Sequence, residues 1–281
     1  MISGETRLAA VIGRPIRHSL SPVILNAAFD AAGLDWRFVA LDVAPGDGAA
    51  AIRATRTLGL GGLSVTMPHK ADAHDAVDET TAVAAELGAV NCVFWRGDRL
   101  VGDNTDGAGF LDALAEDPGI DVAGLRCVVV GAGGAGRAVV RALGAAGAIE
   151  VAVVNRSPEP AHRAAALAGA VGRVGAPQDA AGADLVVNAT PLGMGLVAGE
   201  PLPLDPALLR EGQVVADLIY HPRVTPLLAA AADRGARTTG GLGMLVHQAA
   251  HAFARWTGAD APVAAMAAAA RDELDRRVTD R

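Results

Sequence analysis

Aromatic residues are scarce in this chain of 281 residues. Phe, Trp and Tyr together make up 3% of the sequence, whereas hydrophobic residues as a group reach 51%. A chain of this length and apolar content can form one large domain or two ordinary ones. We therefore expect a sizeable core that is built mainly from Ala, Val and Leu.

Cysteine is nearly absent as well. The two cysteines, Cys92 and Cys127, lie in separate apolar stretches and show neither a metal-binding nor a redox spacing. This usage favours small buried hydrophobic residues in a reducing compartment over a disulfide framework.

Basic runs and long apolar runs are missing too. The formal net charge is −7 and the arginines are scattered, so the chain lacks the electrostatic footprint of a nucleic-acid binder. The first residues do not show the positive and apolar segments of a signal peptide. The Ala-rich stretch 263–270 is too short to span a bilayer and runs into Arg271. We expect a soluble cytoplasmic protein with no nucleic-acid or membrane partner.

The chain instead alternates short apolar runs with longer helical patterns, which predicts an α/β protein with mainly parallel sheets. Ser21 before Pro22 predicts the N-cap of a helix. The expected strands are 8–13, 36–43, 63–65, 89–94, 125–131, 150–155, 184–189 and 213–218. The expected helices are 22–32, 46–58, 79–87, about 105–116, 134–147, 160–168, 242–257 and 262–276.

One turn in the second half carries a nucleotide-binding pattern. The segment Gly131–Gly136 directly follows the apolar run Cys127–Val130 and leads into a helical pattern. In that context Gly131 permits a tight turn, Gly133 lets the backbone approach a pyrophosphate, and Gly136 lets helix and strand pack closely. The helix N-terminus offers N–H groups to the phosphates. We predict a Rossmann dinucleotide site, with an ordinary tight turn as the alternative.

The end of the next predicted strand indicates which dinucleotide binds. NAD-specific units carry Asp or Glu there for the ribose 2′-hydroxyl, but this chain has Asn155 followed by Arg156. A neutral amide removes the repulsion against a 2′-phosphate, and the guanidinium can bind one through charge-assisted hydrogen bonds. The sequence thus predicts NADP(H) over NAD(H), with a solvated surface arginine as the alternative for Arg156.

Two domains are expected. Residues 1–105 form an α/β domain, and the helix that starts near Thr105 or Asp106 crosses to a Rossmann domain over 106–244. The last two helices follow one another without an intervening strand. We therefore expect residues of about 245–281 to pack back on the first domain and complete it.

Polar clusters follow the predicted strands of the first half, where the active sites of α/β proteins gather. Ser19 and Ser21, at the start of a helix, suit a carboxylate ligand, unless Ser21 simply caps the helix. Lys70 is the single lysine of an Arg-dominated chain, and it follows a Pro-containing turn. A lysine near an aspartate can orient a hydroxyl and move a proton when a carbonyl is reduced. A solvated side chain is the alternative for Lys70.

Other chemistries find less support. His247 and His251 stand one helical turn apart, as in a zinc-binding helix, but Gln248 occupies the place where a metalloprotease needs Glu. Ser64 and Ser157 lack the context of a nucleophile elbow. We expect neither a metal site nor a hydrolase.

Taken together and in order, the motifs resemble those of the shikimate dehydrogenase family over essentially the whole chain. Each motif alone is weak, but the ordered set is specific. The motifs that carry the resemblance are Gly13–Pro22, Ser64–Lys70, Gly88–Asn91, Asn104–Gly107, Gly131–Gly136, Asn155–Ser157, Asn188–Met194, Asp217–Pro222 and Gly243–His251.

The resemblance implies an N-terminal α/β substrate domain and a Rossmann-type NADP-binding domain with a cleft between them. It implies NADP-dependent reversible reduction of 3-dehydroshikimate to shikimate, with Lys70 and Asp106 as a catalytic dyad. The implied substrate residues are Ser19 and Ser21 for the carboxylate, then Thr66, Lys70, Asn91, Asp106, Tyr220 and Gln248. The implied cofactor residues are Gly131, Ala132, Gly133, Gly134, Ala135, Asn155, Arg156, Ser157, Thr190, Met194, Leu218 and Gly241.

Three positions depart from the family pattern. Ser64 stands where Asn is common, so an amide contact to the substrate is lost or shortened. Pro160 stands where many members have a second basic residue, so the grip on the 2′-phosphate rests mainly on Arg156, with Ser157 or Arg163 as helpers. Gly240 stands where Asp or Asn is common, and we expect little consequence.

Several alternatives stay open at this point. Within the enzyme class, the chain could be a quinate or aminoshikimate dehydrogenase. From another class, it could be a catalytically silent NADP(H)-sensing regulatory protein on the same fold. The presence of both Lys70 and Asp106 favours the enzyme, because a silent relative has no need of the pair. A small-molecule substrate is expected, and the oligomeric state is left as monomer or homodimer.

Overall fold

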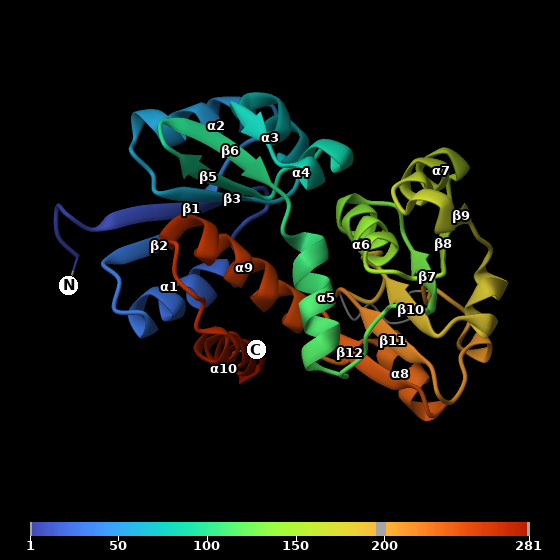
Figure 1. The fold of residues 1–281 in the computed structure, drawn as a ribbon. Coiled ribbons are helices and arrows are strands. Elements are labelled where there is room, and N and C mark those ends of the chain that lie inside the picture. The colour runs from blue at the N-terminus through green and yellow to red at the C-terminus, as the bar shows by residue number, and fades with distance from the viewer. Residues whose placement is uncertain (1, 195–200, 280–281) are drawn as a thin grey trace. The chain divides into compact units, whose positions relative to one another are not determined.

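The computed structural model describes residues 2–194 and 201–279 (Figure 1). The chain divides into two compact units: Met1–Thr105 with Val246–Arg281 form the first, and Asp106–Leu245 form the second. Each unit contains its own six-stranded sheet. One long helix, α9 (Leu242–Thr257), begins in the second unit and ends in the first.

The first sheet is mostly parallel, with the strand order β2-β1-β3-β5-β6-β4. Only β5, among the strands described, runs antiparallel to its neighbours β3 and β6, and a tight turn at Gly97, whose φ is +62°, joins β5 to β6 as a hairpin. The expectation of mainly parallel pairing is confirmed. The strands are β1 (Arg7–Gly13), β2 (Trp36–Asp42), β3 (Gly62–Val65), β4 (Glu79–Thr80), β5 (Cys92–Arg96) and β6 (Arg99–Asp103).

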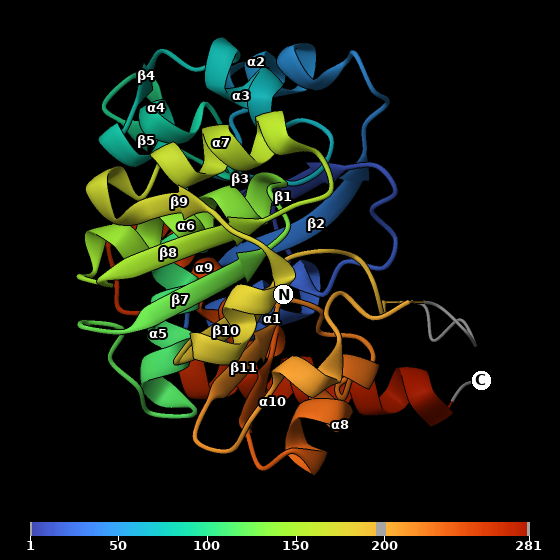
Figure 2. The same ribbon diagram turned by 90° about the vertical axis from the view of Figure 1, so that its right-hand side faces the viewer.

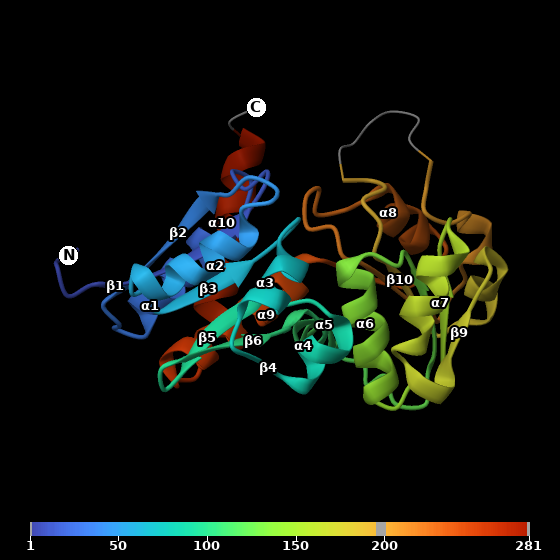
Figure 3. The same ribbon diagram turned by 90° about the horizontal axis from the view of Figure 1, so that it is seen from above.

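Helices cover both faces of this sheet (Figures 1 and 3). Helices α2, α3 and α4 enclose a core on one face, in which Ile12, Ile52 and Leu63 are buried. Helices α1 and α9 lie on the other face, and α10 packs on α1. The helices of this unit besides α9 are α1 (Ser21–Ala31), α2 (Gly48–Thr57), α3 (Lys70–Ala76), α4 (Ala82–Leu87) and α10 (Val263–Thr279).

Five of the few aromatic residues gather on the α1 face of the first sheet. Phe29 stacks on Trp36 with ring centroids 5.3 Å apart and lies 5.5 Å from Phe253. Trp256 stacks on Phe38 at 5.7 Å. Such aromatic pairs contribute about 0.5–1.5 kcal/mol each beyond the area that they bury. They hold the end of α9 against α1 and β2, and the remaining core of the chain is largely aliphatic, as the composition predicts.

All six strands of the second sheet are parallel, in the order β12-β11-β10-β7-β8-β9 (Figure 2). Counted along this unit from β9 to β12, the order is 3-2-1-4-5-6, which is that of a doubly wound dinucleotide-binding sheet. The Rossmann-type fold predicted from the sequence is therefore confirmed. The strands are β7 (Arg126–Val130), β8 (Glu150–Val154), β9 (Gly172–Val174), β10 (Leu185–Asn188), β11 (Val214–Asp217) and β12 (Arg237–Gly240).

Two separate cores lie on the two faces of the second sheet. Helices α5, α6 and α7 cover one face through buried side chains such as Phe110, Leu143 and Ala164, and α8 covers the other through Leu227 and Leu228. The helices are α5 (Asp106–Glu116), α6 (Gly134–Ala145), α7 (Pro158–Ala166) and α8 (Pro226–Asp233). Short 3₁₀ segments cover Gly169–Val171, Pro177–Gly182 and Pro206–Leu208.

Two expectations about local structure are wrong. Ser21 does not cap α1, because it is already the first helical residue and Leu20 stands at the N-cap position without a side-chain hydrogen bond. The helix expected from residue 79 begins at Ala82, because Thr81 caps it and Glu79–Thr80 pair with β6 as β4. The other expected elements agree to within a few residues, whereas α3, α8, β4, β6, β9 and β12 are not among the predicted elements.

Both cysteines are free and buried, Cys92 in β5 and Cys127 in β7. Burial raises the pKa of both thiols, and it raises that of Cys127 to about 12. Because the thiolate is the reactive form, these side chains behave as small hydrophobic groups. The prediction that both cysteines are small buried hydrophobic residues is confirmed.

Candidate functional site

Polar residues of the first unit meet at one edge of its sheet. The carboxyl ends of β1, β3 and β6 lie at this edge together with the amino end of β5, because β5 runs antiparallel to its neighbours. Backbone hydrogen bonds fix the residues at these ends: the Thr66 N–H donates to Ile12 O at 3.0 Å, and the Val65 N–H donates to Asn91 O at 2.8 Å. Asn91 in turn donates its backbone N–H to Asp103 O at 3.0 Å.

Lys70 begins α3 beside this edge. Its backbone carbonyl accepts a hydrogen bond from the Val90 N–H at 2.9 Å, one residue before Asn91. The neighbouring His69 is fully buried and anchors the start of the helix, since its Nε2 lies 2.9 Å from Val43 O and its Nδ1 lies 3.1 Å from Asp72 Oδ2. The position of Lys70 is thus set by contacts to Val43 directly after β2, to α3 itself and to the segment before β5.

Thr105 links three of the residues that the sequence singles out. Its N–H donates to Asn91 Oδ1 at 2.8 Å, and Asn91 Nδ2 donates back to Thr105 Oγ1 at 3.1 Å. The Thr105 hydroxyl donates to the backbone carbonyl of Gln248 on α9 at 3.1 Å. The structure therefore brings Asn91 and Gln248 to the residue that directly precedes Asp106, the first residue of α5.

The serine pair stands in the loop between β1 and α1. The Ser21 N–H donates to Ser19 Oγ at 3.2 Å, and α1 has no side-chain cap. Arg277 Nη1 donates to His18 O at 2.8 Å and so ties this loop to the C-terminal helix α10. The Ser21 hydroxyl therefore does not cap α1, and its expected contact with a substrate carboxylate stays a prediction.

The glycine turn of the second unit has the geometry that the motif predicts. Gly131 adopts φ +107°, and a Cβ there would lie 2.9 Å from Ala189 O. A Cβ on Gly136 would collide with the Gly131 carbonyl oxygen. By contrast, no heavy atom of the described residues lies within 4 Å of a Cβ built on Gly133 or Gly134, so the backbone there is open to a ligand. Gly131 and Gly136 are thus needed for close packing, whereas Gly133 and Gly134 leave space for a ligand.

This contrast predicts that Gly136→Ala and Gly133→Ala fail in different ways. Gly136→Ala should lower the free energy of unfolding by about 1–3 kcal/mol, because overpacking forces helix and strand apart. Gly133→Ala should leave thermal unfolding unchanged but weaken NADP binding, since its methyl group occupies space at the phosphate turn. Differential scanning fluorimetry with and without NADP distinguishes the two, and equal destabilisation by both variants would contradict this division.

Asn155 joins the glycine turn to the start of α7. Its Oδ1 accepts from the Ala132 N–H at 3.2 Å, and its Nδ2 donates to Ser157 O at 2.9 Å. Arg156 and Ser157 lie exposed beside it. Arg163, which the sequence offers as a helper, already pairs with Glu159 at 2.8 Å. Arg156 thus offers an exposed side chain directly after Asn155, whereas the guanidinium of Arg163 is engaged with Glu159.

A buried network organises the ends of the neighbouring strands β10 and β11. Thr190 donates its hydroxyl and its N–H to Asn188 Oδ1 at 2.7 and 3.0 Å. Asn188 Nδ2 donates to Asp217 Oδ1 at 3.0 Å, and the Leu218 N–H donates to Asn188 O at 3.0 Å. Burial raises the pKa of Asp217, although hydrogen bonds from Thr225 and other donors oppose the shift. The network fixes Thr190 and Leu218, two of the predicted cofactor residues.

The remaining predicted residues lie on loops that follow the strands of this sheet. Gly241 donates its N–H to Ile219 O at 3.0 Å, and a Cβ there would collide with Leu218 O. Tyr220 is half-buried after β11, whereas Met194 is exposed after β10. The structure thus brings the glycine turn, Asn155, Thr190, Leu218 and Gly241 to the carboxyl edge of one sheet, as expected for parallel strands.

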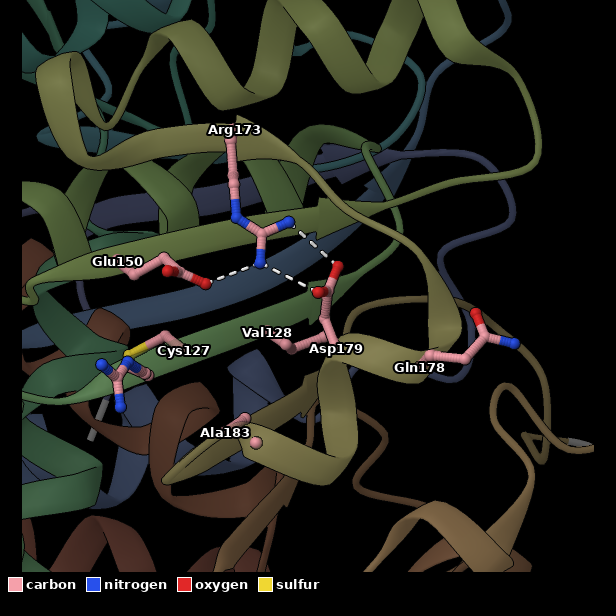
Figure 4. A pocket seen from close by; sticks show the side chains of 9 residues that line it. Cys127, Val128, Glu150, Arg173, Gln178, Asp179 and Ala183 are labelled. Atoms are coloured by element: carbon pink, nitrogen blue, oxygen red, sulfur yellow. Dashed lines mark hydrogen bonds and ion pairs between the residues drawn. The ribbon is translucent and has the colours of Figure 1, made fainter.

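A cavity of about 300 Å³ lies at the opposite, amino edge of the second sheet (Figure 4). Arg126 and Glu150, the first residues of β7 and β8, help to line it. Arg173 donates to both carboxylate oxygens of Asp179 at 3.0 and 2.9 Å and to Glu150 Oε1 at 2.6 Å. The guanidinium of Arg173 is thus paired with the carboxylates of Asp179 and Glu150. None of the predicted cofactor residues lines this cavity.

The Arg173–Asp179 pair predicts a pH-dependent contribution to stability. Hydrogen bonding to Arg173 holds the pKa of Asp179 below its usual value. Such an acid stabilises the fold above its unfolded pKa of about 3.9, and this contribution is lost as the pH falls through the folded pKa. We expect Asp179→Asn to lower Tm by about 1–4 °C at neutral pH, and the difference from wild type to shrink below about pH 4. A difference that persists undiminished in acid would contradict this origin.

Two classes of feature are not found among the residues described. Within 2–194 and 201–279, no group of three or more His, Cys, Asp or Glu side chains could hold a metal ion. In the same ranges, no helix has both the length and the apolar character needed to cross a membrane.

A parallel sheet with this strand order, carrying a glycine turn with Asn155 and Arg156 beside it, defines a dinucleotide-binding protein of the oxidoreductase type. Models of three shikimate dehydrogenase domains match the chain: the substrate binding domain at residues 11–93, shikimate / quinate 5-dehydrogenase at 113–190 and the C-terminal domain at 241–271. The chain belongs to the shikimate dehydrogenase family, and the family predicted from the sequence is confirmed.

Relatives and solved structures agree with this assignment. The chain is 45% identical over 283 residues to the shikimate dehydrogenase (NADP(+)) of Moorella thermoacetica, with 97% of this chain and 95% of that protein covered. It superimposes on a shikimate dehydrogenase crystallised with NADP⁺ at a TM-score of 0.90 and 36% identity, covering 98% of both chains. It superimposes on the Thermus thermophilus enzyme in complex with NADP(H) and shikimate at a TM-score of 0.88 and 37% identity, covering 95% and 100%.

The structure also gives positions to residues that the sequence motifs left without a role. Thr105 connects Asn91 to Gln248, and Asn188 with Asp217 supports Thr190. All of these side chains lie inside family motifs, but as neighbours of the residues to which a role was assigned. A polar residue buried within an otherwise apolar strand end, such as Asn188, is the sequence signal that could have identified them.

Proposed function

We propose that this protein catalyses the NADP-dependent, reversible reduction of 3-dehydroshikimate to shikimate. The observation that carries the proposal is membership of the shikimate dehydrogenase family over 97% of the chain, with Lys70 and Asp106 both present. The expectations of an NADP-dependent enzyme and of this reaction agree with the names of the relatives. The silent regulatory alternative is disfavoured for the same reason.

The residues at the carboxyl edge of the second sheet fit NADP. Gly133 and Gly134 leave open space for the pyrophosphate, and the N-terminus of α6 offers N–H groups to it. The exposed Arg156 guanidinium suits the 2′-phosphate, and Asn155 brings no negative charge to oppose it. When bound, NADP(H) supplies or accepts the hydride at the ring carbon that carries the reacting oxygen.

The residues of the first unit suit an anionic polyol. We assign Ser19 and Ser21 to the substrate carboxylate, where two hydroxyls at the start of α1 can donate hydrogen bonds. Thr66, Asn91, Asp106 and Gln248 would hold the ring hydroxyls, and Tyr220 would flank the substrate. Asn91 donates an amide hydrogen to Thr105 Oγ1 and accepts from the Thr105 N–H, so its amide is held in one orientation.

Lys70 and Asp106 are proposed to move the proton. In the reducing direction, the carbonyl carbon gains a hydride and the carbonyl oxygen gains a proton, which the Lys70–Asp106 pair supplies. The ammonium group would also stabilise negative charge that develops on this oxygen. Because the two groups titrate as a coupled unit, we assign the proton to the pair.

The division of labour follows the two units. We propose that residues 1–105 with about 245–281 bind the substrate and that residues 106–244 bind NADP, which agrees with the division of the chain into compact units. We further propose a cytoplasmic enzyme that acts as a monomer or homodimer on small molecules, without a nucleic-acid or membrane partner. The acidic net charge of −7 and the two buried free thiols support this setting.

Isotope transfer tests the proposed reaction. NADPH that carries deuterium at the transferred position is incubated with 3-dehydroshikimate, and the product is analysed by mass spectrometry. We expect deuterated shikimate, and a Lys70→Ala sample serves as the control for uncatalysed reduction. Absence of labelled shikimate with the wild-type protein would overturn the proposal, and labelled product from 3-dehydroquinate alone would point to a quinate dehydrogenase.

A further inference from the structure

Asp103 is a buried carboxylate that stands three residues before Asp106, at the end of β6. Its side chain is 6% exposed, accepts three hydrogen bonds and forms an ion pair with Arg255. The Thr81 hydroxyl donates to Oδ1 at 2.6 Å, and the Asn104 N–H donates to the same oxygen at 2.9 Å. Arg255, on α9, donates from Nε to Oδ2 at 3.0 Å, and its Nη2 forms an ion pair with the same oxygen at 2.9 Å.

The charge pairing explains why a carboxylate is stable at this position. An ionised carboxylate without a partner is costly to bury, whereas hydrogen bonds from a guanidinium offset much of that cost. The Arg255 guanidinium is held from a second side as well, because it lies 5.5 Å from the centroid of the Phe94 ring. Asp103 is therefore fixed between Thr81, the backbone of Asn104 and the end of α9.

This pair connects the two elements that carry proposed substrate residues. Arg255 and Gln248 are seven residues apart on α9, and residues at this spacing share one face of a helix. Thr105 is bonded to Asn91 and to the Gln248 carbonyl, and Asn91 is bonded through its backbone to Asp103. The strand end and the helix are thus joined at two points, through Asp103–Arg255 and through Thr105–Gln248.

We propose that the Asp103–Arg255 pair is a positioning device for the catalytic carboxylate. It holds the segment Asn104–Thr105 in register with α9, and Asp106 follows Thr105 in the chain, so the pair sets where the Asp106 backbone begins. Neither member touches the substrate in this role, and neither exchanges a proton with it. The inference rests on the proposed function, because it gives Asp106 its meaning as a catalytic group.

Substitutions of Arg255 and Asp103 test the inference, because it predicts a large effect on kcat and a small effect on the KM for NADP. Arg255→Ala and Asp103→Asn should each lower kcat by about 10–100-fold, because small misplacements of a catalytic group are costly. The KM for NADP should stay within about twofold of wild type, since the cofactor residues lie in the other unit. Arg255→Lys, which keeps the charge and one hydrogen bond, should recover part of the loss. The double variant should be no worse than Arg255→Ala, because each change removes the same interaction.

Chemical rescue separates positioning from general stability. Arg255 lines a cavity of about 340 Å³ together with Arg7, Trp95 and Trp256, so its truncation leaves space that is reachable from solvent. Millimolar guanidinium ion should restore a saturable part of kcat in Arg255→Ala, but none in the Asp103→Asn/Arg255→Ala double variant. The matched control is Arg37→Ala, which breaks an exposed 2.9 Å pair with Asp30 in the same unit and should leave kcat unchanged.

Two results would overturn the inference. One is a kcat of Arg255→Ala that equals that of the wild type. The other is a decrease in kcat that is fully explained by a smaller folded fraction and that guanidinium ion does not reverse. Should the wild-type protein fail to reduce 3-dehydroshikimate, the proposed function fails instead. The pair is then judged by amide hydrogen exchange at Asn104 and Thr105, which should be at least about tenfold faster in Arg255→Ala, or in Arg255→Lys if the first variant does not fold.

Discussion

Lys70→Ala is expected to lower kcat by about 10²- to 10⁴-fold while shikimate still binds. The reason is that Lys70 is proposed to supply charge and a proton to the reacting oxygen, whereas the carboxylate and ring hydroxyls are held by other side chains. Steady-state kinetics with both substrates, together with calorimetric titration of shikimate, measure the two effects separately. Lys70 is anchored through its backbone and through His69, so the variant should fold.

The composition of the chain provides an independent check of the same prediction. Lys70 is the single lysine, so reductive methylation modifies only this side chain and the N-terminal amine. Methylation should abolish turnover, and saturating shikimate should protect against it. Lys70→Ala, treated in the same way, is the matched control for any effect at the N-terminus. Near-normal turnover in Lys70→Ala, or in fully methylated wild-type protein, would contradict the proposed mechanism.

Arg156→Gln is expected to lower kcat/KM with NADP by about 10- to 100-fold and to leave kcat/KM with NAD nearly unchanged. Hydrogen bonds to a charged group contribute about 1.5–3 kcal/mol, and NAD lacks the phosphate that would receive them. The exposed position of Arg156 makes a structural effect small. Steady-state kinetics with both dinucleotides provide the measurement.

Arg163→Gln is the control for the coenzyme prediction. Arg163 lies in the last turn of α7, whereas Arg156 precedes the helix, and Arg163 pairs with Glu159 at 2.8 Å. Its loss should therefore change NADP preference much less than the loss of Arg156. Pro160 makes the comparison informative, because no second basic residue stands at that position to compensate. Equal losses with NADP and NAD in Arg156→Gln would mean that the guanidinium does not read the 2′-phosphate.

Local patterns were sufficient to predict the main architecture. The run Cys127–Val130 followed by Gly131–Gly136 predicts strand, turn and helix, because each step is encoded within a few consecutive residues. Most other predicted strands likewise coincide with a short apolar run of consecutive residues. The elements that were not predicted are short: α3 has seven residues and β9 has three. Helices of this length depend on tertiary contacts such as those of buried His69, which no local pattern contains.

The candidate site divides in the same way. Side chains that we propose to face the ligands, such as Lys70 and Asn91, lie in short motifs and could be identified from them. Their supports could not, because the partners are distant in sequence: Arg255 reaches Asp103 across 152 residues, and Thr105 reaches Gln248 across 143. The prediction of Ser21 as a helix cap is wrong because α1 begins at Ser21 itself, with Leu20 at the N-cap position. The sequence alone does not show this shift of one residue.

The central claim is that this chain transfers hydride between NADP and shikimate. It is tested most directly by measuring kcat/KM of the wild-type protein for shikimate and for quinate, each with NADP⁺ and with NAD⁺, at the absorbance band of the reduced nicotinamide. We predict the highest value for shikimate with NADP⁺. Activity with NAD⁺ alone would contradict the reading of Asn155 and Arg156, and no activity with any of the four pairs would contradict the enzyme itself.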